Sequence, residues 1–457
     1  MRTSSNHSLR RHSKSHNASW RKRGASFERL EPRNLMDAAG FVETNLASDI
    51  PNFAAHTDRD LINPWGATET PQGQFRVAAN GAGNAPLMTA QGQEEGPAIF
   101  IPAPPSDPKG TVSAPNGVVS NTTHDFVITE GGHSAPASLI FSTEDGTIAA
   151  FNPDLNKTQA VLAADQSSTG AVYKLVTMAS NTRGNFLYAT DFHNNKIDVF
   201  DKNFHKVTLG SGGFGTFTDP KEPAGYAPFG VKSANGILFV TYAKQLGPDN
   251  HDDQEGPGNG LIDEFDTSGH FIKRFATGSA VGGTAPLNSP IGAALAPPGF
   301  GPNGKFGGAL LIGNFGDSRV SAFDPATGKF LGQLTDAQGH TLVLNGGFKE
   351  TNTKGLWGIA FGNGQGGAAT DALFFAAGIN GEADGLFGKV TMATGDAPDE
   401  DNLQPPSTHS DDGDRKDAAD GHDNQNQHSH VASVSPQTAQ GKMAGRLADL
   451  VFEAMGH

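Results

Sequence analysis

The chain has 457 residues, a formal net charge of -15 and no cysteine. Disulfides, thiolate nucleophiles and zinc–sulfur sites are therefore excluded, and the acidic charge argues against nucleic acid as a partner. The 59 glycines disfavour a helix-rich fold, because each glycine costs about 1 kcal/mol in a helix interior. Short strands with tight turns accommodate so many glycines, and the 30 phenylalanines indicate dry packing between sheets.

Residues 1–40 are predicted to be a disordered basic leader. Seven of the 33 basic side chains lie in residues 1–26, together with none of the 48 acidic ones. The segment lacks the apolar run of a secretory signal peptide. It ends in a stretch that reads LEPRNLM over Leu30–Met36.

This stretch resembles the LEPR-type motif of bacterial surface and exported proteins, in which LEPR is followed by one variable residue and two leucines. Met36 stands where the second leucine would be. The resemblance implies export, to the cell surface or the extracellular space. The alternative is a capped amphipathic turn on a linker.

Residues 41–392 contain a repeated phrase in which a β-branched residue and two others precede a phenylalanine and an Asn or Asp. The phenylalanines are Phe151, Phe200, Phe265 and Phe323. A second phrase, with an apolar residue before glycine, recurs at 64–66, 228–230, 290–292 and 356–358. Repeats of roughly 40–50 residues are typical of four-stranded propeller blades. The sequence predicts an all-β, six-bladed β-propeller, with the strand at 41–46 completing the last blade and closing the ring.

Three details of the blades are predicted as well. The repeated phenylalanines pack between neighbouring blades, and the Asn or Asp after each accepts a turn hydrogen bond. The second blade is expected to run through Phe126–Ile128 and residues 138–143, with an Asp-Gly turn after them.

Beyond residue 392 the composition changes. Residues 393–435 form an acidic, histidine-containing segment that is predicted to be disordered, with ten acidic and two basic side chains from Asp396 to Asp423. Apolar residues in 436–457 have helical spacing, which predicts a short amphipathic helix that either docks on a partner or is marginal. No transmembrane segment is predicted.

Five phrases of the propeller region carry a further resemblance. They lie at residues 45–51, 63–66, 143–148, 313–317 and 377–381. In this order they resemble a family of conserved hypothetical bacterial proteins. The resemblance implies a six-bladed propeller of the NHL and TolB-like kind over residues 41–392, and no activity is assigned to that family.

The sharpest local cluster is an insertion in the fourth blade. Within seven residues it holds Asp249, His251, Asp252, Asp253 and Glu255. Four carboxylates and a histidine are suitable ligands for Ca²⁺, which accepts six to eight oxygens in flexible geometry. The spacing is not that of an EF-hand, and a solvated acidic loop is the alternative.

A second candidate set lies at strand ends that are expected to meet at one mouth of the central channel. Its members are polar residues at corresponding places in several blades, namely Asn80, Glu144, Asp191, Asn314 and Asn380. Such residues could hold a divalent ion that acts as a Lewis acid in lactone or ester hydrolysis. The alternative is that they are hairpin-turn residues.

The sequence favours an exported or cell-envelope propeller, expected to be a monomer, that acts as a binding or scaffold module. Its partner would be an unidentified small molecule, glycan or protein at the propeller face. The alternative is a metal-dependent hydrolase or lyase, similar to a lactonase, with its site at the channel mouth. Motifs of serine hydrolases, P-loop enzymes and zinc proteases are absent from the sequence.

Overall fold

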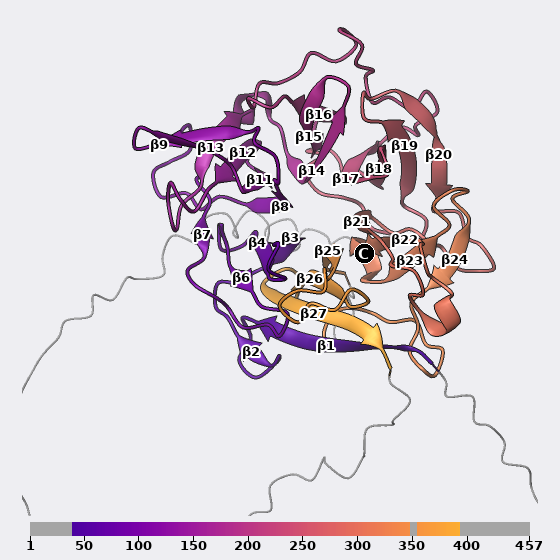
Figure 1. Cartoon of the computed structure of the whole chain (residues 1–457). Coiled ribbons are helices and arrows are strands. Elements are labelled where there is room, and N and C mark those ends of the chain that lie inside the picture. Colours follow the sequence, from indigo (N-terminus) through magenta and orange to yellow (C-terminus); the bar gives the residue numbers. More distant parts are fainter. Residues whose placement is uncertain (1–38, 348–353, 394–457) are drawn as a thin grey trace, which may run out of the picture. The chain divides into compact units, whose positions relative to one another are not determined.

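A ring of β-sheets makes up the computed structural model, which describes residues 39–347 and 354–393 (Figure 1). Six blades follow one another around the ring in chain order. The export motif, the acidic segment and the terminal helix that the sequence predicts lie outside the described residues.

Each blade is an antiparallel sheet whose first strand lies nearest the centre of the ring (Figure 1). The blades are as follows: blade one, β3 (Pro64–Glu69), β4 (Phe75–Ala79), β5 (Asn84–Ala85), β6 (Leu87–Met88) and β7 (Ile99–Phe100); blade two, β8 (Pro115–Ser120), β11 (Leu139–Thr143), β12 (Thr147–Phe151) and β13 (Val161–Asp165); blade three, β14 (Tyr173–Asn181), β15 (Gly184–Asp191) and β16 (Lys196–Phe200). They continue as blade four, β17 (Tyr226–Ala234), β18 (Ile237–Lys244), β19 (Leu261–Asp266) and β20 (Phe271–Thr277); blade five, β21 (Pro290–Leu295), β22 (Leu310–Asn314), β23 (Val320–Phe323) and β24 (Phe330–Gln333); blade six, β25 (Leu356–Phe361), β26 (Leu373–Ile379), β27 (Asp384–Met392) and β1 (Phe41–Ser48).

The N-terminal strand β1 closes the ring. Strand β1 pairs antiparallel with β27, so that Phe41 lies opposite Met392 and Ser48 opposite Leu386. A short strand, β2 (His56–Thr57), adds to the outer side of β1 in parallel. The predicted six-bladed ring with an N-terminal closing strand is confirmed, and blade six joins the two ends of the propeller.

The repeated phenylalanines are buried between neighbouring blades, as predicted. Phe200 packs with Ile148 of blade two, and Phe265 packs with Tyr188 of blade three. Phe323 packs with Phe275 of blade four, with ring centroids 6.1 Å apart. Side chains without polar atoms suit this place because no hydrogen-bond partner is needed there.

The Asn or Asp after each phenylalanine organises the next turn. Asp201 Oδ1 accepts hydrogen bonds from the backbone N–H groups of Asn203 and His205, at 2.8 and 2.9 Å. Asp266 accepts the corresponding pair from Ser268 and His270. The predicted turn role is confirmed.

The prediction for the start of blade two is wrong. Its innermost strand is β8, whereas residues near Phe126 belong to a separate hairpin of β9 (Val127–Glu130) and β10 (His133–Pro136). Phe126 and Ile128 are buried against blades two and three although they lie outside the blade sheet, whereas Val127 is 51% exposed. The sequence pattern does not identify strand β8, because Asn116 stands where four of the blades have an apolar residue before glycine.

The inner strands of neighbouring blades approach closely, which explains why the second repeated phrase contains a glycine. A Cβ on Gly66 would lie 2.5 Å from the carbonyl oxygen of Asn116, and one on Gly292 would lie 2.6 Å from that of Trp357. Both neighbours are backbone atoms of the next blade, so a larger residue would push the blades apart.

Helices contribute little to the described residues. They comprise the 3₁₀ turns η1 (Ser167–Thr169), η2 (Pro302–Gly304) and η3 (Phe315–Asp317). Within residues 39–347 and 354–393, no helix has the length and apolar character needed to cross a membrane.

Candidate functional site at the channel mouth

All six innermost strands contain a β-bulge at the same place, near their first residue. A bulge turns a side chain out of the regular alternation of the strand. In each strand, the pairing register shifts at the bulge. The first residues within the bulges are Trp65, Asn116, Lys174, Phe229, Ile291 and Trp357. Most of them meet at the centre of the ring, although they come from different blades.

Apolar side chains fill this central space. Trp65 stacks on Trp357 with ring centroids 3.5 Å apart. Phe315 also stacks on Trp357, with ring centroids 4.0 Å apart. Phe229 and Ile291 belong to the same buried cluster. We call this cluster the plug.

Lys174 replaces the apolar residue in blade three and lies against the plug. Its ammonium group is 5.1 Å from the ring centroid of Trp65, 5.8 Å from Phe192 and 5.9 Å from Phe229. The residue is 1% exposed. A desolvated cation over aromatic faces gains about 2 kcal/mol for a good contact.

A carboxylate partner compensates this buried charge. Lys174 Nζ lies 2.6 Å from Glu144 Oε1, in the turn between β11 and β12. The other oxygen, Glu144 Oε2, accepts a 2.9 Å hydrogen bond from Asn80 Nδ2 of blade one. Two of the predicted mouth residues, Asn80 and Glu144, are thus in direct contact.

The insertion of blade four reaches the same point. One ligand atom each from Glu144, His251 and Asp252 lies within 4.8 Å of the others. We call these three residues the mouth cluster. Asp252 Oδ1 is also 3.9 Å from Lys174 Nζ. Parts of the two candidate sites therefore lie together: Asn80 and Glu144 of the one, and His251 and Asp252 of the other.

The remaining insertion residues have different surroundings. Asp253 is buried, and burial raises its pKa to about 7 against the lowering effect of a hydrogen bond from Ser289. Glu255 Oε1 pairs with Lys354 Nζ at 2.6 Å, just before blade six begins. Asp249 is exposed, and its backbone carbonyl accepts a 2.9 Å hydrogen bond from His193.

Three predicted mouth residues bond within their own blades. Asp191 accepts a hydrogen bond from Asn194 at 2.9 Å. Asn314 accepts one from the backbone N–H of Asn288 at 3.0 Å. Asn380 has φ of 55° in the turn after β26 and is exposed. Their contacts agree with the turn alternative, and they do not share a partner with the mouth cluster.

Sequence reasoning missed both lysines of the mouth. Lys174 has a usable signal, since it occupies the place that Trp65 and Phe229 have in the repeated second phrase. Lys354 has none, because its proximity to Glu255 depends on how blades four and six curve around the ring.

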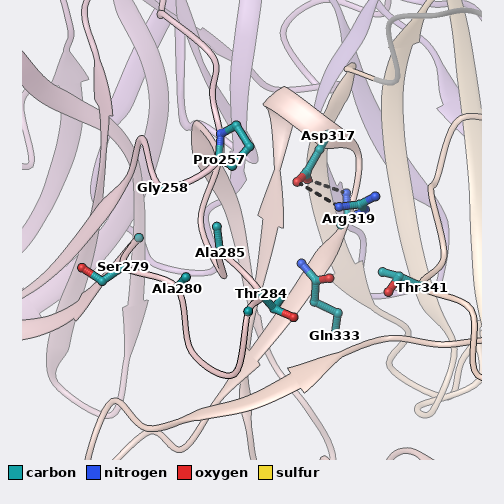
Figure 2. Close-up of a pocket in the computed structure, with 12 residues that line it drawn as sticks. Pro257, Gly258, Ser279, Ala280, Thr284, Ala285, Asp317, Arg319, Gln333 and Thr341 are labelled. Carbon is teal, nitrogen blue, oxygen red and sulfur yellow. Dashed lines mark hydrogen bonds and ion pairs between the residues drawn. The ribbon is translucent and has the colours of Figure 1, made fainter.

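A groove of about 650 Å³ has no residue of the mouth cluster in its lining (Figure 2). It is lined by glycine- and alanine-rich connections of blade four and by polar residues of blade five, including Gln333 and Thr341. Asp317 and Arg319 face each other there with 3.8 Å between Oδ2 and Nη1 (Figure 2). Burial raises the pKa of Asp317, and Arg319 opposes this. No sequence-predicted site residue lines the groove.

Fold and site together define the class: a six-bladed β-propeller with a plugged channel and a charged mouth. Protein L690 of Acanthamoeba polyphaga mimivirus is 31% identical to this chain over 298 residues, covering 64% of this chain and 74% of the viral protein. The chain belongs to the same family as L690. The mimivirus protein R648 is 29% identical over 361 residues, covering 76% and 78% of the two chains. Both relatives are uncharacterised.

Solved propellers are similar to the chain in outline. Virginiamycin B lyase from Staphylococcus aureus, with Quinupristin, aligns at a TM-score of 0.43 and 14% identity over 78% of this chain and all of the lyase. The PQQ-bound aldose sugar dehydrogenase from Streptomyces coelicolor aligns at 0.41 and 12% identity, over 78% and 98%. No residue role is transferred from these enzymes. No family model matches the chain, so the resemblance to conserved hypothetical bacterial proteins stays a prediction.

Proposed function

We propose that the protein is an exported β-propeller that acts as a binding or scaffold module, with its ligand held at the channel mouth. The observation that carries the proposal is the meeting of Glu144, Lys174 and Asp252 from three different blades. The buried apolar residues of the plug support binding at the surface of the mouth rather than within the channel.

The chemistry of the mouth favours a polyhydroxylated ligand such as a glycan over the small molecule and protein partners also considered. The exposed carboxylate of Asp252 can accept hydrogen bonds from hydroxyl groups, and the partly exposed Lys354 can donate to them. The partly exposed pair of Glu255 and Lys354 adds one negative and one positive group to this surface. A strongly anionic ligand is disfavoured, because acidic groups outnumber the lysines at the mouth.

The proposal is tested by isothermal titration with a panel of neutral mono- and oligosaccharides. Asp252→Asn should weaken binding about tenfold, because a hydrogen bond to a charged group contributes roughly 1.5–3 kcal/mol. Asp249→Asn is the matched control, since it removes the same charge from the same exposed loop outside the cluster. Equal affinity for both variants, or no binding by the wild-type protein, would contradict the proposal.

One observation favours the second candidate, a metal-dependent hydrolase or lyase. The mouth cluster offers two carboxylates and an imidazole within 4.8 Å, which suits a Ca²⁺ ion acting as a Lewis acid. Lys174 weighs against it, because its ammonium group already lies 2.6 Å from Glu144. Lactone and ester hydrolysis should be measured with Ca²⁺ and with EDTA. Turnover that EDTA abolishes and Asp252→Asn reduces would favour the enzyme over the binding module.

A further inference from the structure

A second group of carboxylates lies where the ring closes. Asp58 follows β2, and its backbone N–H donates a 2.9 Å hydrogen bond to the carbonyl of Ser48 on β1. Glu94 belongs to blade one, where it pairs with Met88 in an isolated bridge. Together with Asp60 they form a set that we call the seam carboxylates, since it links the closing strand to the first blade.

The three side chains come close enough to share one cation. One carboxylate oxygen each from Asp58, Asp60 and Glu94 lies within 4.8 Å of the others. Two oxygens bound to the same Ca²⁺ ion are at most about 4.8 Å apart, which is twice a Ca–O distance of about 2.4 Å. Asp60 and Glu94 are exposed, so solvent reaches the outer side of the group.

Asp58 supplies an independent sign of a ligand. The residue is 7% exposed, and its Oδ1 accepts a 2.9 Å hydrogen bond from the backbone N–H of Asp60. Its Oδ2 is buried without a hydrogen-bond partner among the residues that the structure describes. A buried carboxylate oxygen that nothing satisfies is costly, and such atoms are rare unless an ion or water fills the gap.

One buried cation, Arg76, interacts with this group of carboxylates. Arg76 acts on Glu94 electrostatically, but its Nη1 donates a 2.8 Å hydrogen bond to the carbonyl of Ala85. Burial raises the pKa of Asp58, and the charge of Asp60 adds to this effect. Burial also raises the pKa of Glu94, with Asp58 and Asp60 contributing. The three carboxylates thus repel one another, and Arg76 partly offsets this repulsion at Glu94.

We propose that the seam carboxylates bind a Ca²⁺ ion that ties the closing strand to blade one. Oxygen ligands on flexible connections suit calcium, and water molecules would complete its coordination. The ion would neutralise the repulsion and satisfy Asp58 Oδ2. This site is separate from the mouth cluster and does not depend on the function proposed for it.

The test uses the full chain after removal of metals with EDTA and dialysis. Calcium binding is measured by isothermal titration, and thermal unfolding is followed by circular dichroism with and without CaCl₂. At a free Ca²⁺ concentration 100 times the Kd, the Tm should rise by about 3–4 °C, since only the folded protein has the site. Asp58→Asn and Glu94→Gln should each weaken binding at least about tenfold.

Two controls make the result specific. Glu95→Gln removes a charge one residue away and should keep wild-type binding and the full Tm rise. Asp252→Asn should do the same, which separates this site from the mouth cluster. If Asp58→Asn does not fold, Glu94→Gln decides, because Glu94 is exposed. Wild-type calcium binding in Glu94→Gln, or no calcium binding by the wild-type protein, would overturn the proposal.

Discussion

The mouth cluster and the seam carboxylates have similar ligands but different surroundings. At the mouth, Lys174 provides a cation 2.6 Å from Glu144, and aromatic rings surround its ammonium group. At the seam, Asp58 is also buried. The guanidinium group of Arg76 donates to the backbone carbonyl of Ala85 and not to Asp58. The comparison teaches that clustered carboxylates alone do not define a metal site. The local counter-charge decides whether an added ion stabilises the fold.

The largest effect is expected from removing the cation at the mouth. Lys174→Met should lower the free energy of unfolding by about 3–5 kcal/mol, because the buried charge of Glu144 would lose the ammonium group that compensates it. Urea unfolding measures this loss. The double variant Lys174→Met with Glu144→Gln should recover part of it, since no charge is then left uncompensated.

The same variant tests the comparison directly. Once Lys174 is replaced, the mouth should resemble the seam, and Ca²⁺ should stabilise the variant more than it stabilises the wild-type protein. Titration of Tm against CaCl₂ in both proteins measures the difference. Equal calcium responses would show that Lys174 does not act as the counter-charge of the mouth cluster.

A smaller, pH-dependent effect is expected at Asp253. Burial raises its pKa from 3.8 to about 7, so the folded state favours the protonated acid. Its contribution to stability is fully present below about pH 4 and is lost as the pH rises through 7. Asp253→Asn should therefore stabilise the protein by up to about 4 kcal/mol at pH 8, since one pKa unit corresponds to about 1.4 kcal/mol, and leave it unchanged near pH 4.

Unfolding in urea at pH 4, 6 and 8 measures this difference between Asp253→Asn and the wild-type protein. Asp249→Asn serves as the control, because it removes a charge from an exposed part of the same insertion. A stability difference that does not change with pH would contradict the assigned protonation of Asp253.

The smallest effect concerns the rim of the mouth. Glu255→Gln removes the 2.6 Å ion pair with Lys354, in which both side chains remain partly exposed. Such pairs contribute little because water screens them, and we expect a loss of about 0.5 kcal/mol that shrinks in 1 M NaCl. A loss as large as that of Lys174→Met would show that exposure does not separate the two pairs.

The fold could be predicted because its determinants are local and repeated. Phe200, Phe265 and Phe323 recur with the same neighbours in sequence, and each packs between two blades. The closing strand was also predictable, since the last blade lacks one strand. Blade two was misjudged where Asn116 interrupts the apolar pattern of the inner strand, because periodicity alone does not identify a polar position facing the channel.

The candidate site was predictable only in part. Their polarity alone identifies Glu144 and the insertion residues as candidates, but as members of two separate sets. Their meeting with Lys174 could not be predicted, because it joins turns of blades two and four to a strand of blade three. Asp58 gave no signal at all, since its burial depends on how the chain passes from β1 to blade one.

By itself, the sequence determined the repeated blade, the glycine and phenylalanine positions that let blades approach, and the closure by the N-terminal strand. These follow from short-range patterns that each blade repeats. Only the tertiary structure decided which charges are compensated, because curvature of the ring brings distant turns together. That is why Lys174 neutralises the mouth while Asp58 faces two other carboxylates at the seam.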